Sequence, residues 1–382
     1  MSDLTLPLTE PAVQHRPGFE LLVGSKAFWA CAAQDIAAAR RRVLIQAMTF
    51  EGDAAGSQVA SAICASPAAD RRVLVDDYTC HVINDTFLAL SRAPQLQAEA
   101  AATWAMFDAI EASGAALRIT NPVGRNPLRY ALRNHKKLLV MDDVLWIGGI
   151  NFSDHNFAWH DMMLRIDHAG IANWLAGEFE RDWRGETASS AAEIAGVSLF
   201  SVDGSSNEGH FASLLSLFAN ATRSIEVVSA YPTFPFIDAM ASAARRGVPV
   251  RLYTPRPNNK PVIRDYLMGV AQHSGLEIRL MEEMTHVKAA LVDGEALVVG
   301  SSNFDFVSHR ANAEYVATIR DADLIADFEA RLLEPARAGS VPAGPQDYSR
   351  WRSWKARLGL LAADVVVSWL NHGPRIAEWR AP

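Results

Sequence analysis

One pattern occurs twice in the chain, as NHKKLLVMDDVLWIGGINFSDHNF at 134–157 and as THVKAALVDGEALVVGSSNFDFVS at 285–308. Each copy opens with His-x-Lys, continues as an apolar run, turns at acidic or glycine residues, and ends a second apolar run at glycine. Short apolar runs that flank such a turn are typical of a β-hairpin. The two copies therefore predict one hairpin in each of two similar halves.

The sequence around these hairpins repeats as well. The two motif histidines lie 151 residues apart, and strands alternate with helical stretches in both parts of the chain. This alternation predicts parallel strands in an α/β fold, and a single long repeat indicates a duplication rather than a solenoid. The matched strand segments include 41–50 with 224–234 and 113–120 with 274–281.

Changes in composition mark the boundaries of the halves. The small, polar stretch RGETASSAAEIAG (184–196) is the expected join, and PARAGSVPAGPQ (335–346) is a second break. We therefore expect a first half at 19–185, a second half at 196–335 and a C-terminal tail at 347–382.

The overall composition excludes several classes of protein. The chain has 382 residues, 49% of them hydrophobic, with 23 Gly, 18 Pro and 3 Cys, so it is neither disordered, collagen-like nor a disulfide scaffold. Its net charge of −7 argues against a bulk polyanion binder. The cysteines lack metal-type spacing, no secretory signal is visible, and no run of 18 apolar residues occurs. We expect a cytoplasmic monomer without specific binding of nucleic acid.

Each hairpin carries the motif His-x-Lys-x4-Asp. This composition yields the pattern by chance about 0.01 times per chain, so two copies at matching places are significant. Residues i and i+2 of a strand share a face, so each histidine should project beside its lysine. The aspartate falls at the turn, where we expect it to orient the hairpin rather than to react. The motif residues are His135, Lys137 and Asp142, and His286, Lys288 and Asp293.

Further polar residues follow each motif. An asparagine comes after small residues in GGIN and in GSSN, and a carboxylate follows in WHDMML and in NAEYV. Each half thus supplies one histidine, one lysine, one amide and one acid. The added residues are Asn151, Asp161, Asn303 and Glu314.

This set of side chains suits the cleavage of a phosphodiester. Lysine and asparagine donate hydrogen bonds to phosphoryl oxygens, whose negative charge increases during attack. One neutral imidazole attacks phosphorus to form a covalent phosphohistidine, and the second, protonated, gives the leaving oxygen its proton. A carboxylate on the far ring nitrogen fixes the tautomer. The scheme requires no metal ion and no cofactor.

With these motifs the chain resembles the phospholipase D superfamily, in the two-motif bacterial branch that contains cardiolipin and phosphatidylserine synthases. The resemblance is strongest at GSSNFDFVSHRANAE (300–314), which is similar to Gly-Ser-x-Asn-x-Asp-x-Arg-Ser-x-x-x-Asn-x-Glu. Position 307 is Val where that pattern has Arg, and the first hairpin is one residue tighter than the second. The resemblance implies a duplicated α/β/α sandwich of two pseudosymmetric halves, with the active site at their interface.

The resemblance also implies a role for each site residue. His135 resembles the nucleophile, and His286 resembles the general acid and base. Asp161 and Glu314 resemble the acids that orient the histidines. The implied phosphate-binding set comprises Lys137, Lys288, Asn151, Asn303 and Ser301.

The implied function is phosphatidyl transfer, or phospholipid hydrolysis, through a covalent phosphohistidine. The lipid headgroup and the acceptor, water or an alcohol such as glycerol or phosphatidylglycerol, stay open. Two other functions also stay open: an endonuclease that uses the same site, and a phosphate-binding module without activity. The net charge of −7 argues against the nuclease.

Two further groups of residues each have two interpretations. His155 and His160 fit no standard zinc spacing, so we expect them to line or support the pocket rather than bind metal. Arg125, Arg129 and Arg133 recur at helical spacing and form either a solvated face or a phosphate clamp.

The tail carries an apolar stripe at helical spacing with cations between its members. An amphipathic helix at 351–370 would present this stripe to the protein core or to a membrane interface, where tryptophan and cations suit the headgroup region. Peripheral association with a membrane through the tail is one of these two outcomes. The stripe consists of Trp351, Trp354, Leu358, Leu361 and Val365, and the cations are Arg352, Lys355 and Arg357.

Overall fold

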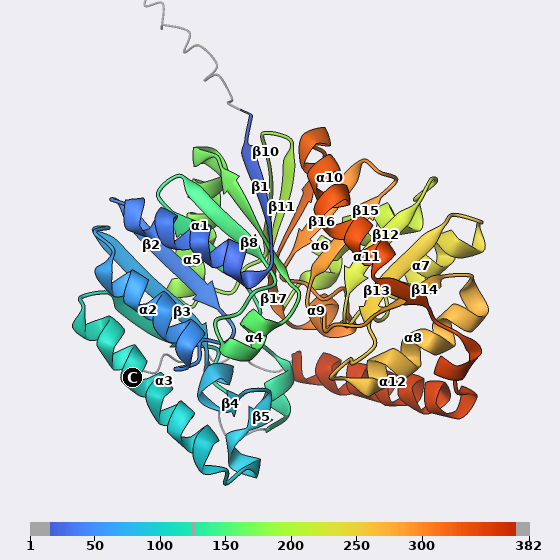
Figure 1. The fold of residues 1–382 in the computed structure, drawn as a ribbon, viewed down its shortest axis with the longest axis horizontal. Coiled ribbons are helices and arrows are strands. Elements are labelled where there is room, and N and C mark those ends of the chain that lie inside the picture. The colour runs from blue at the N-terminus through green and yellow to red at the C-terminus, as the bar shows by residue number, and fades with distance from the viewer. Residues whose placement is uncertain (1–15, 124–126, 372–382) are drawn as a thin grey trace, which may run out of the picture.

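The computed structural model describes residues 16–123 and 127–371 and contains two large β-sheets (Figure 1). The first sheet has seven strands, all from the first half. In spatial order they are β1 (Gly18–Val23), β9 (Met162–Asp167), β8 (Val144–Gly148), β7 (Leu138–Met141), β2 (Arg42–Ala47), β3 (Asp70–Asp76) and β6 (Ala116–Thr120).

The second sheet has nine strands, all from the second half. In spatial order they are β10 (Ser190–Ile194), β11 (Val197–Asp203), β17 (Ala313–Ile319), β16 (Ala296–Gly300), β15 (Lys288–Val292), β12 (Ile225–Ser229), β13 (Val250–Pro255), β14 (Glu277–Met281) and β18 (Ser340–Pro342). A small hairpin of β4 (Val82–Ile83) and β5 (Thr86–Phe87) follows β3 in the first half.

The two sheets share one topology, as the internal repeat predicts. β2, β3 and β6 are mutually parallel, and so are their counterparts β12, β13 and β14. Each predicted hairpin is present, as β7–β8 and as β15–β16, and its first strand pairs antiparallel with the nearest of the three parallel strands, β2 or β12. The predicted parallel pairing therefore holds for three strands of each sheet. The remaining pairs are antiparallel, and among them β7–β8, β10–β11 and β15–β16 are hairpins, whose tight connection reverses the chain direction.

Helices cover both faces of each sheet, which confirms the predicted α/β/α layers. α1, α2 and α3 pack on the outer face of the first sheet, and α6, α7, α8 and α12 pack on the outer face of the second. The helix bounds are α1 (Ser25–Ala38), α2 (Ala54–Ala65), α3 (Pro94–Ala112), α4 (Asp154–Ala158), α5 (Ala169–Trp183), α6 (Asn207–Ala219), α7 (Phe236–Arg245), α8 (Pro261–Ser274), α9 (Phe306–Arg310), α10 (Ala322–Phe328), α11 (Glu334–Ala338) and α12 (Arg350–Asn371).

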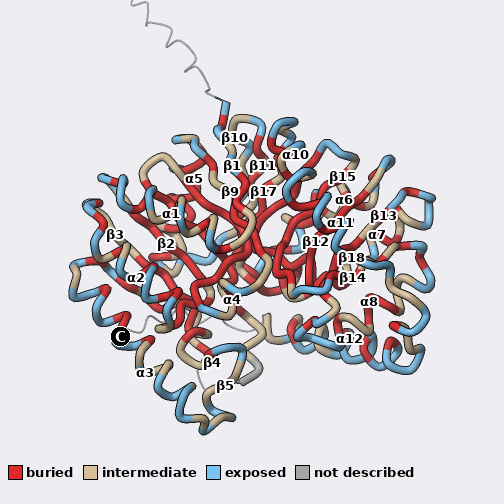
Figure 2. Tube along the Cα trace, in the orientation of Figure 1, coloured by how far each residue is buried: buried red, intermediate tan, exposed pale blue. Residues whose placement is uncertain are grey.

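The middle layer joins the two halves into one body. It contains α5 from the first half and α10 and α11 from the second, packed between the inner faces of both sheets. Leu44 and Leu138 of the first sheet share one apolar core with Leu291 and Tyr315 of the second. Figure 2 shows this continuous buried region at the centre of the molecule. Because both faces of the hairpin strands are covered, their sequences are apolar throughout instead of alternating.

The second half extends beyond the range expected from composition at both ends. Within the expected join at 184–196, β10 already forms a hairpin with β11. After 335, β18 adds to the far edge of the second sheet beside β14. These additions have the weak apolar pattern of short edge strands, which explains why the sequence did not mark them.

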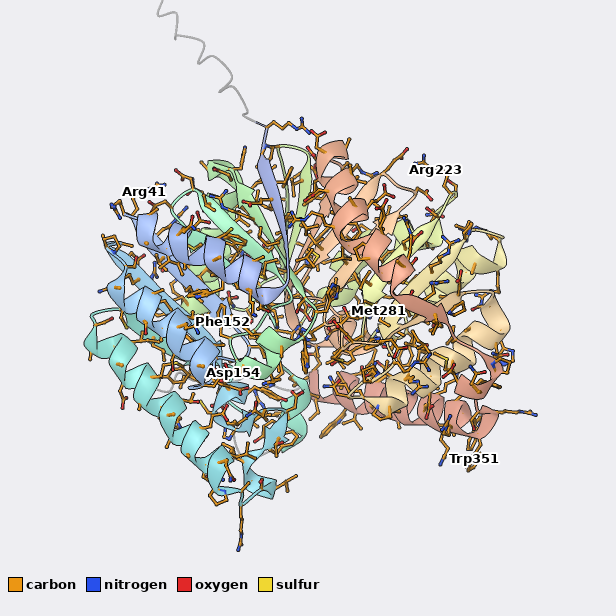
Figure 3. All side chains as sticks on the ribbon, in the orientation of Figure 1. Arg41, Phe152, Asp154, Arg223, Met281 and Trp351 are labelled. Carbon is orange, nitrogen blue, oxygen red and sulfur yellow. The ribbon has the colours of Figure 1, made fainter. Side chains whose placement is uncertain are left out.

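The tail helix α12 docks on the second half, but not through the predicted stripe. Its buried residues are Ser353, Ala356, Leu360 and Val367, which face α8 and the outer core. The predicted stripe lies on the opposite side and is exposed, with Trp351 at 61% and Val365 at 68%. Figure 3 shows Trp351 at the outer end of α12, directed away from the protein. The helix therefore uses one face for docking and leaves the stripe free.

Within the described ranges, no helix is both long and apolar enough to cross a membrane. Cys31 and Cys64 are thiols outside any disulfide.

Candidate active site

The motif histidines lie where the two halves meet, and backbone pairing between the halves fixes both. His135 precedes β7, and its N–H donates to the carbonyl oxygen of Ala313 at 2.9 Å. His286 precedes β15, and its N–H donates to the carbonyl oxygen of His160 at 2.7 Å. Each contact adjoins a short parallel bridge between the halves. Each motif is thus held by the opposite half.

Each histidine side chain also pairs with a carboxylate of the opposite half. His135 Nδ1 lies 3.1 Å from Glu314 Oε2, and His286 Nδ1 lies 2.9 Å from Asp161 Oδ2. All four side chains are buried. A carboxylate at Nδ1 keeps the proton of a neutral imidazole on that nitrogen, so the Nε2 lone pair stays free for reaction. The sequence predicted these four residues but not their crossed pairing.

Glycines at the hairpin ends make room for the carboxylates. A Cβ on Gly149 would lie 2.5 Å from Asp161 Oδ1, well inside the 3.0 Å limit of real Cβ contacts. A Cβ on Gly300 would collide with the carbonyl oxygen of Tyr315, the residue after Glu314. Asp161 directly precedes β9, and Glu314 lies within β17. Only glycine at the end of each hairpin lets these two strands lie so close to it.

The motif lysines are buried beside the histidines. Lys137 Nζ donates to the carbonyl oxygen of His135 at 2.9 Å, and Lys288 Nζ donates to that of His286 at 2.6 Å. Burial lowers the pKa of Lys137 to about 7, with added repulsion from Lys288, and burial lowers the pKa of Lys288 to about 8. An anion between the two ammonium groups would offset both effects, so the site favours a negatively charged ligand.

The two carboxylates differ in their surroundings. Glu314 accepts hydrogen bonds from the Ser301 hydroxyl at 2.5 Å and the Ser308 hydroxyl at 2.7 Å, whereas Asp161 accepts one from a backbone N–H at 2.8 Å. Burial acts to raise the pKa of Glu314, but its histidine and these donors hold that pKa below its ordinary value. Burial raises the pKa of Asp161 to about 7, despite the nearby lysines. Glu314 is therefore ionised at neutral pH, whereas Asp161 retains a proton up to about pH 7.

Both imidazoles are neutral at neutral pH. Burial lowers the pKa of His135 to about 4, although Glu314 opposes this change. Burial also lowers the pKa of His286 well below its ordinary value, and Lys288 lowers it further. A neutral imidazole is the form that can attack phosphorus. A phosphodiester in the site would add negative charge beside His286 and so favour its protonated form.

The predicted phosphate-binding amides make few contacts with the protein. The side-chain oxygen of Asn303 has no hydrogen-bond partner among the described residues. The side chain of Asn151 makes long hydrogen bonds, 3.4 Å from the Thr49 N–H and 3.5 Å to Asn156 Oδ1. Both amides are thus free to serve a ligand. Ser301 was assigned to the same set, but its hydroxyl contacts Glu314, which favours a role in orienting that carboxylate.

The motif aspartates lie at the turns of the hairpins. The carboxylate of Asp142 accepts the backbone N–H groups of residues 40–42 at 2.9–3.0 Å, and that of Asp293 accepts those of residues 222–224 at 2.7–3.1 Å. In Figure 3 the labelled Arg41 and Arg223 mark these two places at the upper tips of the halves. This geometry fits the predicted role of the aspartates in orienting the hairpins.

Sequence reasoning missed three residues around His286. The rings of Trp159 and Tyr231 lie 5.2 and 6.0 Å from the His286 ring, measured between centroids. Lys260 Nζ lies 4.3 Å from the centroid of the Tyr231 ring, and its charge lowers the pKa of His286 and Lys288. Lys260 belongs to no motif, but the chain has only six lysines, and that scarcity was the available signal.

The arginine series has a different role from the two that the sequence left open. Arg133 is buried, and its Nη1 lies 2.7 Å from Asp76 Oδ1. It is therefore neither part of a solvated face nor a free phosphate clamp. Its Nη2 donates to the carbonyl oxygen of Arg129, and Arg125 lies outside the described residues.

The predicted pocket histidines lie close to the site. His160 Nδ1 lies 3.1 Å from Thr285 Oγ1, next to His286. The His155 ring contacts Trp159 edge to face at 5.2 Å. His160 therefore packs next to His286, and His155 packs against Trp159, whose ring contacts His286.

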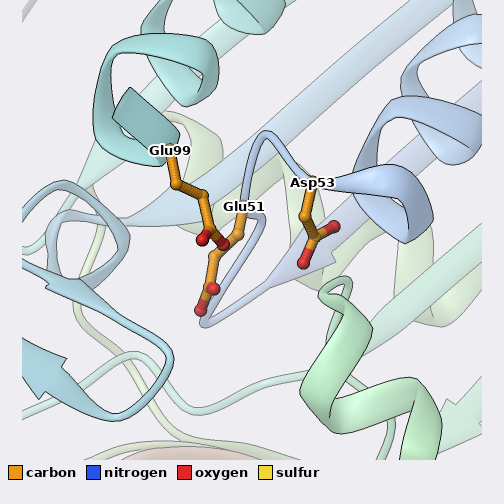
Figure 4. Close-up of side chains that lie close together, drawn as sticks. All are labelled: Glu51, Asp53 and Glu99. Carbon is orange, nitrogen blue, oxygen red and sulfur yellow. The ribbon is translucent and has the colours of Figure 1, made fainter. Parts of the chain in front are cut away.

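One acidic cluster lies in the first half (Figure 4), where Glu51 Oε2 is 3.8 Å from His155 Nδ1. Carboxylate oxygens of Glu51, Asp53 and Glu99 lie within 4.8 Å of one another. Burial raises the pKa of Glu51 to about 8, and its side chain hydrogen-bonds with Glu99. A proton shared between Glu51 and Glu99 accounts for their proximity without a metal ion.

The chain is similar to known proteins in sequence and in fold. The model of the family "Cardiolipin synthase, PLD-like domain" matches residues 33–183 and 214–334. Cardiolipin synthase B of Escherichia coli strain K12 is 24% identical, over 95% of this chain and 92% of that protein. The crystal structure of phosphatidylserine synthase from Haemophilus influenzae Rd KW20 superposes with a TM-score of 0.71 at 16% identity, covering 92% of this chain and 94% of that one. A polyphosphate kinase from Porphyromonas gingivalis shares the fold with a TM-score of 0.59 over 53% of its length.

Proposed function

Because the chain belongs to the cardiolipin synthase family of phospholipase D-like phosphatidyltransferases, we propose that it moves a phosphatidyl group from a glycerophospholipid to an acceptor hydroxyl. The observation that carries this proposal is the crossed arrangement of two buried histidine–carboxylate pairs around two buried lysines. Such a site supplies a nucleophile, a proton donor and an anion-binding pair within one interface.

The first step forms a covalent intermediate. His135 Nε2 attacks the phosphorus of the phosphodiester, so a P–N bond forms while the P–O bond to the headgroup alcohol breaks. His286 gives its proton to the leaving oxygen. Glu314, ionised and held by two serine hydroxyls, stabilises the charge that develops on His135.

The second step releases the product. His286, now neutral, takes the proton of the acceptor hydroxyl, whose oxygen attacks phosphorus while the P–N bond breaks. An alcohol acceptor gives a new phospholipid, and water gives phosphatidic acid. Lys137 and Lys288, with the amides of Asn151 and Asn303, donate to the phosphoryl oxygens in both steps.

The difference between the two carboxylates supports this division of roles. Glu314 accepts two hydrogen bonds from hydroxyl groups and is negatively charged, and the His135 imidazole beside it is neutral. A histidine nucleophile must be neutral. The Asp161 side accepts fewer hydrogen bonds and retains a proton to about pH 7. A proton held in the Asp161–His286 pair is available to the leaving oxygen when substrate binds.

A lipid substrate fits the rest of the molecule better than a nucleic acid does. The net charge of −7 opposes binding of a long polyanion. The exposed apolar stripe of α12 fits a bilayer interface, and we propose peripheral contact with the membrane through it.

The proposal can be tested with purified full-length protein. It is incubated separately with mixed phospholipids and with DNA, with and without EDTA, and the products are identified by mass spectrometry. We expect new or hydrolysed phospholipid at a rate that EDTA leaves unchanged, because lysine and imidazolium already supply the positive charge. Cleaved DNA with intact lipid would indicate a nuclease, and no product from either substrate would indicate a phosphate-binding module.

A further inference from the structure

A groove lies between the first turns of α12 and the neighbouring helices α7 and α8, on the outer side of the second half. It encloses a cavity of about 810 Å³, which is within the usual size of ligand sites. Gly269 of α8 lets α12 approach, since a Cβ there would lie 2.8 Å from Ser353 Cβ. The Ser353 hydroxyl lines the cavity, is 8% exposed, and has no hydrogen-bond partner among the described residues. The groove therefore contains a buried polar group that the protein does not use.

The groove is positively charged in a negatively charged protein. Arg245, Arg350 and Arg357 line it, and the positive charges of Arg245 and Arg357 act on one nearby carboxylate. The carboxylate that faces them is Asp238. Three guanidinium groups against one carboxylate leave an excess of positive charge, which suits a phosphate group.

The groove adjoins the exposed apolar stripe of α12. At 100° per residue, Arg350 and Arg357 fall on the flank of the helix between the buried face and the stripe. Trp351 and Trp354, which stack at 5.1 Å, both line the cavity and begin the stripe. Further along the stripe, Leu361 is 41% exposed. Beyond the end of the stripe, the exposed side chain of Trp369, at 72%, extends the apolar surface of the helix. Tryptophan prefers the headgroup level of a bilayer, so cavity and stripe would lie at matching depths.

We propose that this groove binds the phosphate-bearing headgroup of an anionic phospholipid while the stripe rests in the interface of the same bilayer. Within it, the arginines contact the lipid phosphate and the Ser353 hydroxyl contacts the headgroup. The net charge of −7 would otherwise repel an anionic membrane, so a local cationic site is needed for docking. The inference rests on the proposed function only in taking a phospholipid bilayer as the place where the enzyme works.

Vesicle sedimentation with the full chain tests this inference. The vesicles contain phosphatidylcholine with or without phosphatidylglycerol, and the variants are Arg350→Gln/Arg357→Gln and the control Arg320→Gln. Arg320 is exposed, lies outside the groove and forms no ion pair among the described residues. We expect tighter binding when phosphatidylglycerol is present. In the double variant, the affinity for vesicles that contain phosphatidylglycerol should fall by about fivefold for each arginine replaced, so the preference is lost. The control should keep the preference of the wild type.

Two further measurements make the outcome unambiguous. Thermal melting of each variant shows whether it is folded, and emission of Trp351 and Trp354 should shift to the blue when vesicles bind. Equal binding to both vesicle types, or an unchanged preference in the folded double variant, would overturn the inference. Wild-type turnover is assayed separately. Vesicle binding without turnover would refute the proposed function but support the lipid site in the groove. Turnover without a preference for anionic vesicles would support the proposed function but refute the lipid site.

Discussion

His135 Nδ1 lies 3.1 Å from Oε2 of Glu314, a residue that follows it by 179 positions and belongs to the other half of the fold. The same relationship holds in reverse for His286 and Asp161 at 2.9 Å. Neither half therefore contains a complete histidine–carboxylate pair. The site exists only when both halves are docked, and this explains why they share one apolar core instead of forming separate domains.

Replacing either histidine should abolish turnover. His135→Ala removes the nucleophile and His286→Ala removes the proton donor, so each should lower kcat by about 10⁴-fold or more. His210→Ala, on α6 and away from the site, is the matched control and should leave kcat unchanged. Substantial activity of either purified, folded histidine variant would refute the two-histidine mechanism.

The neighbouring lysines Lys136 and Lys137 should have different roles, the first in stability and the second in catalysis. Lys136 is buried with its Nζ 2.8 Å from Asp182 Oδ2 and 4.6 Å from the centroid of the Tyr315 ring, on the side away from the site. Lys136→Met leaves the Asp182 carboxylate without its cation, with only the Gln46 amide as donor, and should destabilise the fold by about 3 kcal/mol while folded enzyme keeps its kcat. Lys137→Met should lower kcat by about 10²–10³-fold.

Denaturant unfolding and steady-state kinetics on both lysine variants check this prediction. If Lys136→Met loses activity as severely as Lys137→Met while remaining folded, the two lysines are not divided between structure and catalysis.

The motif aspartates should matter for stability. Asp142→Ala removes the acceptor of three backbone N–H groups and should lower the free energy of unfolding by about 2 kcal/mol, with little change in kcat of the folded enzyme. Its neighbour Asp143 forms an exposed ion pair with Arg41, so Asp143→Ala should change stability by less than about 1 kcal/mol. A folded Asp142→Ala protein without activity would assign this aspartate to the chemistry.

The pH dependence of kcat/KM should report the free site. His135 must be neutral, and with a pKa of about 4 it becomes protonated only as the pH falls toward that value. Lys137 must be charged, and with a pKa of about 7 it loses its proton as the pH rises through neutrality, followed by Lys288 at about 8. We therefore expect kcat/KM to be highest between about pH 5 and 7 and to decline above. A value that rises steadily from pH 6 to 9 would contradict these assignments.

Much of the fold followed from the sequence because it depends on local patterns. Apolar runs around acidic turns predicted both hairpins, and the duplication predicted two matching sheets. The edge strands β10 and β18 were not predicted, because segments of three to five residues are too short to show a distinct apolar period. The face of α12 that docks was not predicted either, since small residues such as Ser353 and Ala356 pack where α8 carries a glycine.

The candidate site was predicted as a set of residues but not as an arrangement. Spacing in the chain identified His135, Asp161, His286 and Glu314, but a repeat suggests pairing within each copy. The crossed pairing arises from backbone contacts between the halves, which no local pattern encodes. Lys260 and Tyr231 were missed because they reach the site from loops without a motif.

Trapping the covalent intermediate shows directly whether His135 is the nucleophile of the phosphotransfer. Purified enzyme is mixed rapidly with phosphatidylglycerol, quenched with denaturant at alkaline pH to preserve the P–N bond, and analysed by peptide mass spectrometry. We expect a phosphatidyl adduct on the peptide that contains His135, present in the wild type and absent from His135→Ala. An adduct on His286, or rapid turnover with no adduct on either histidine, would contradict it.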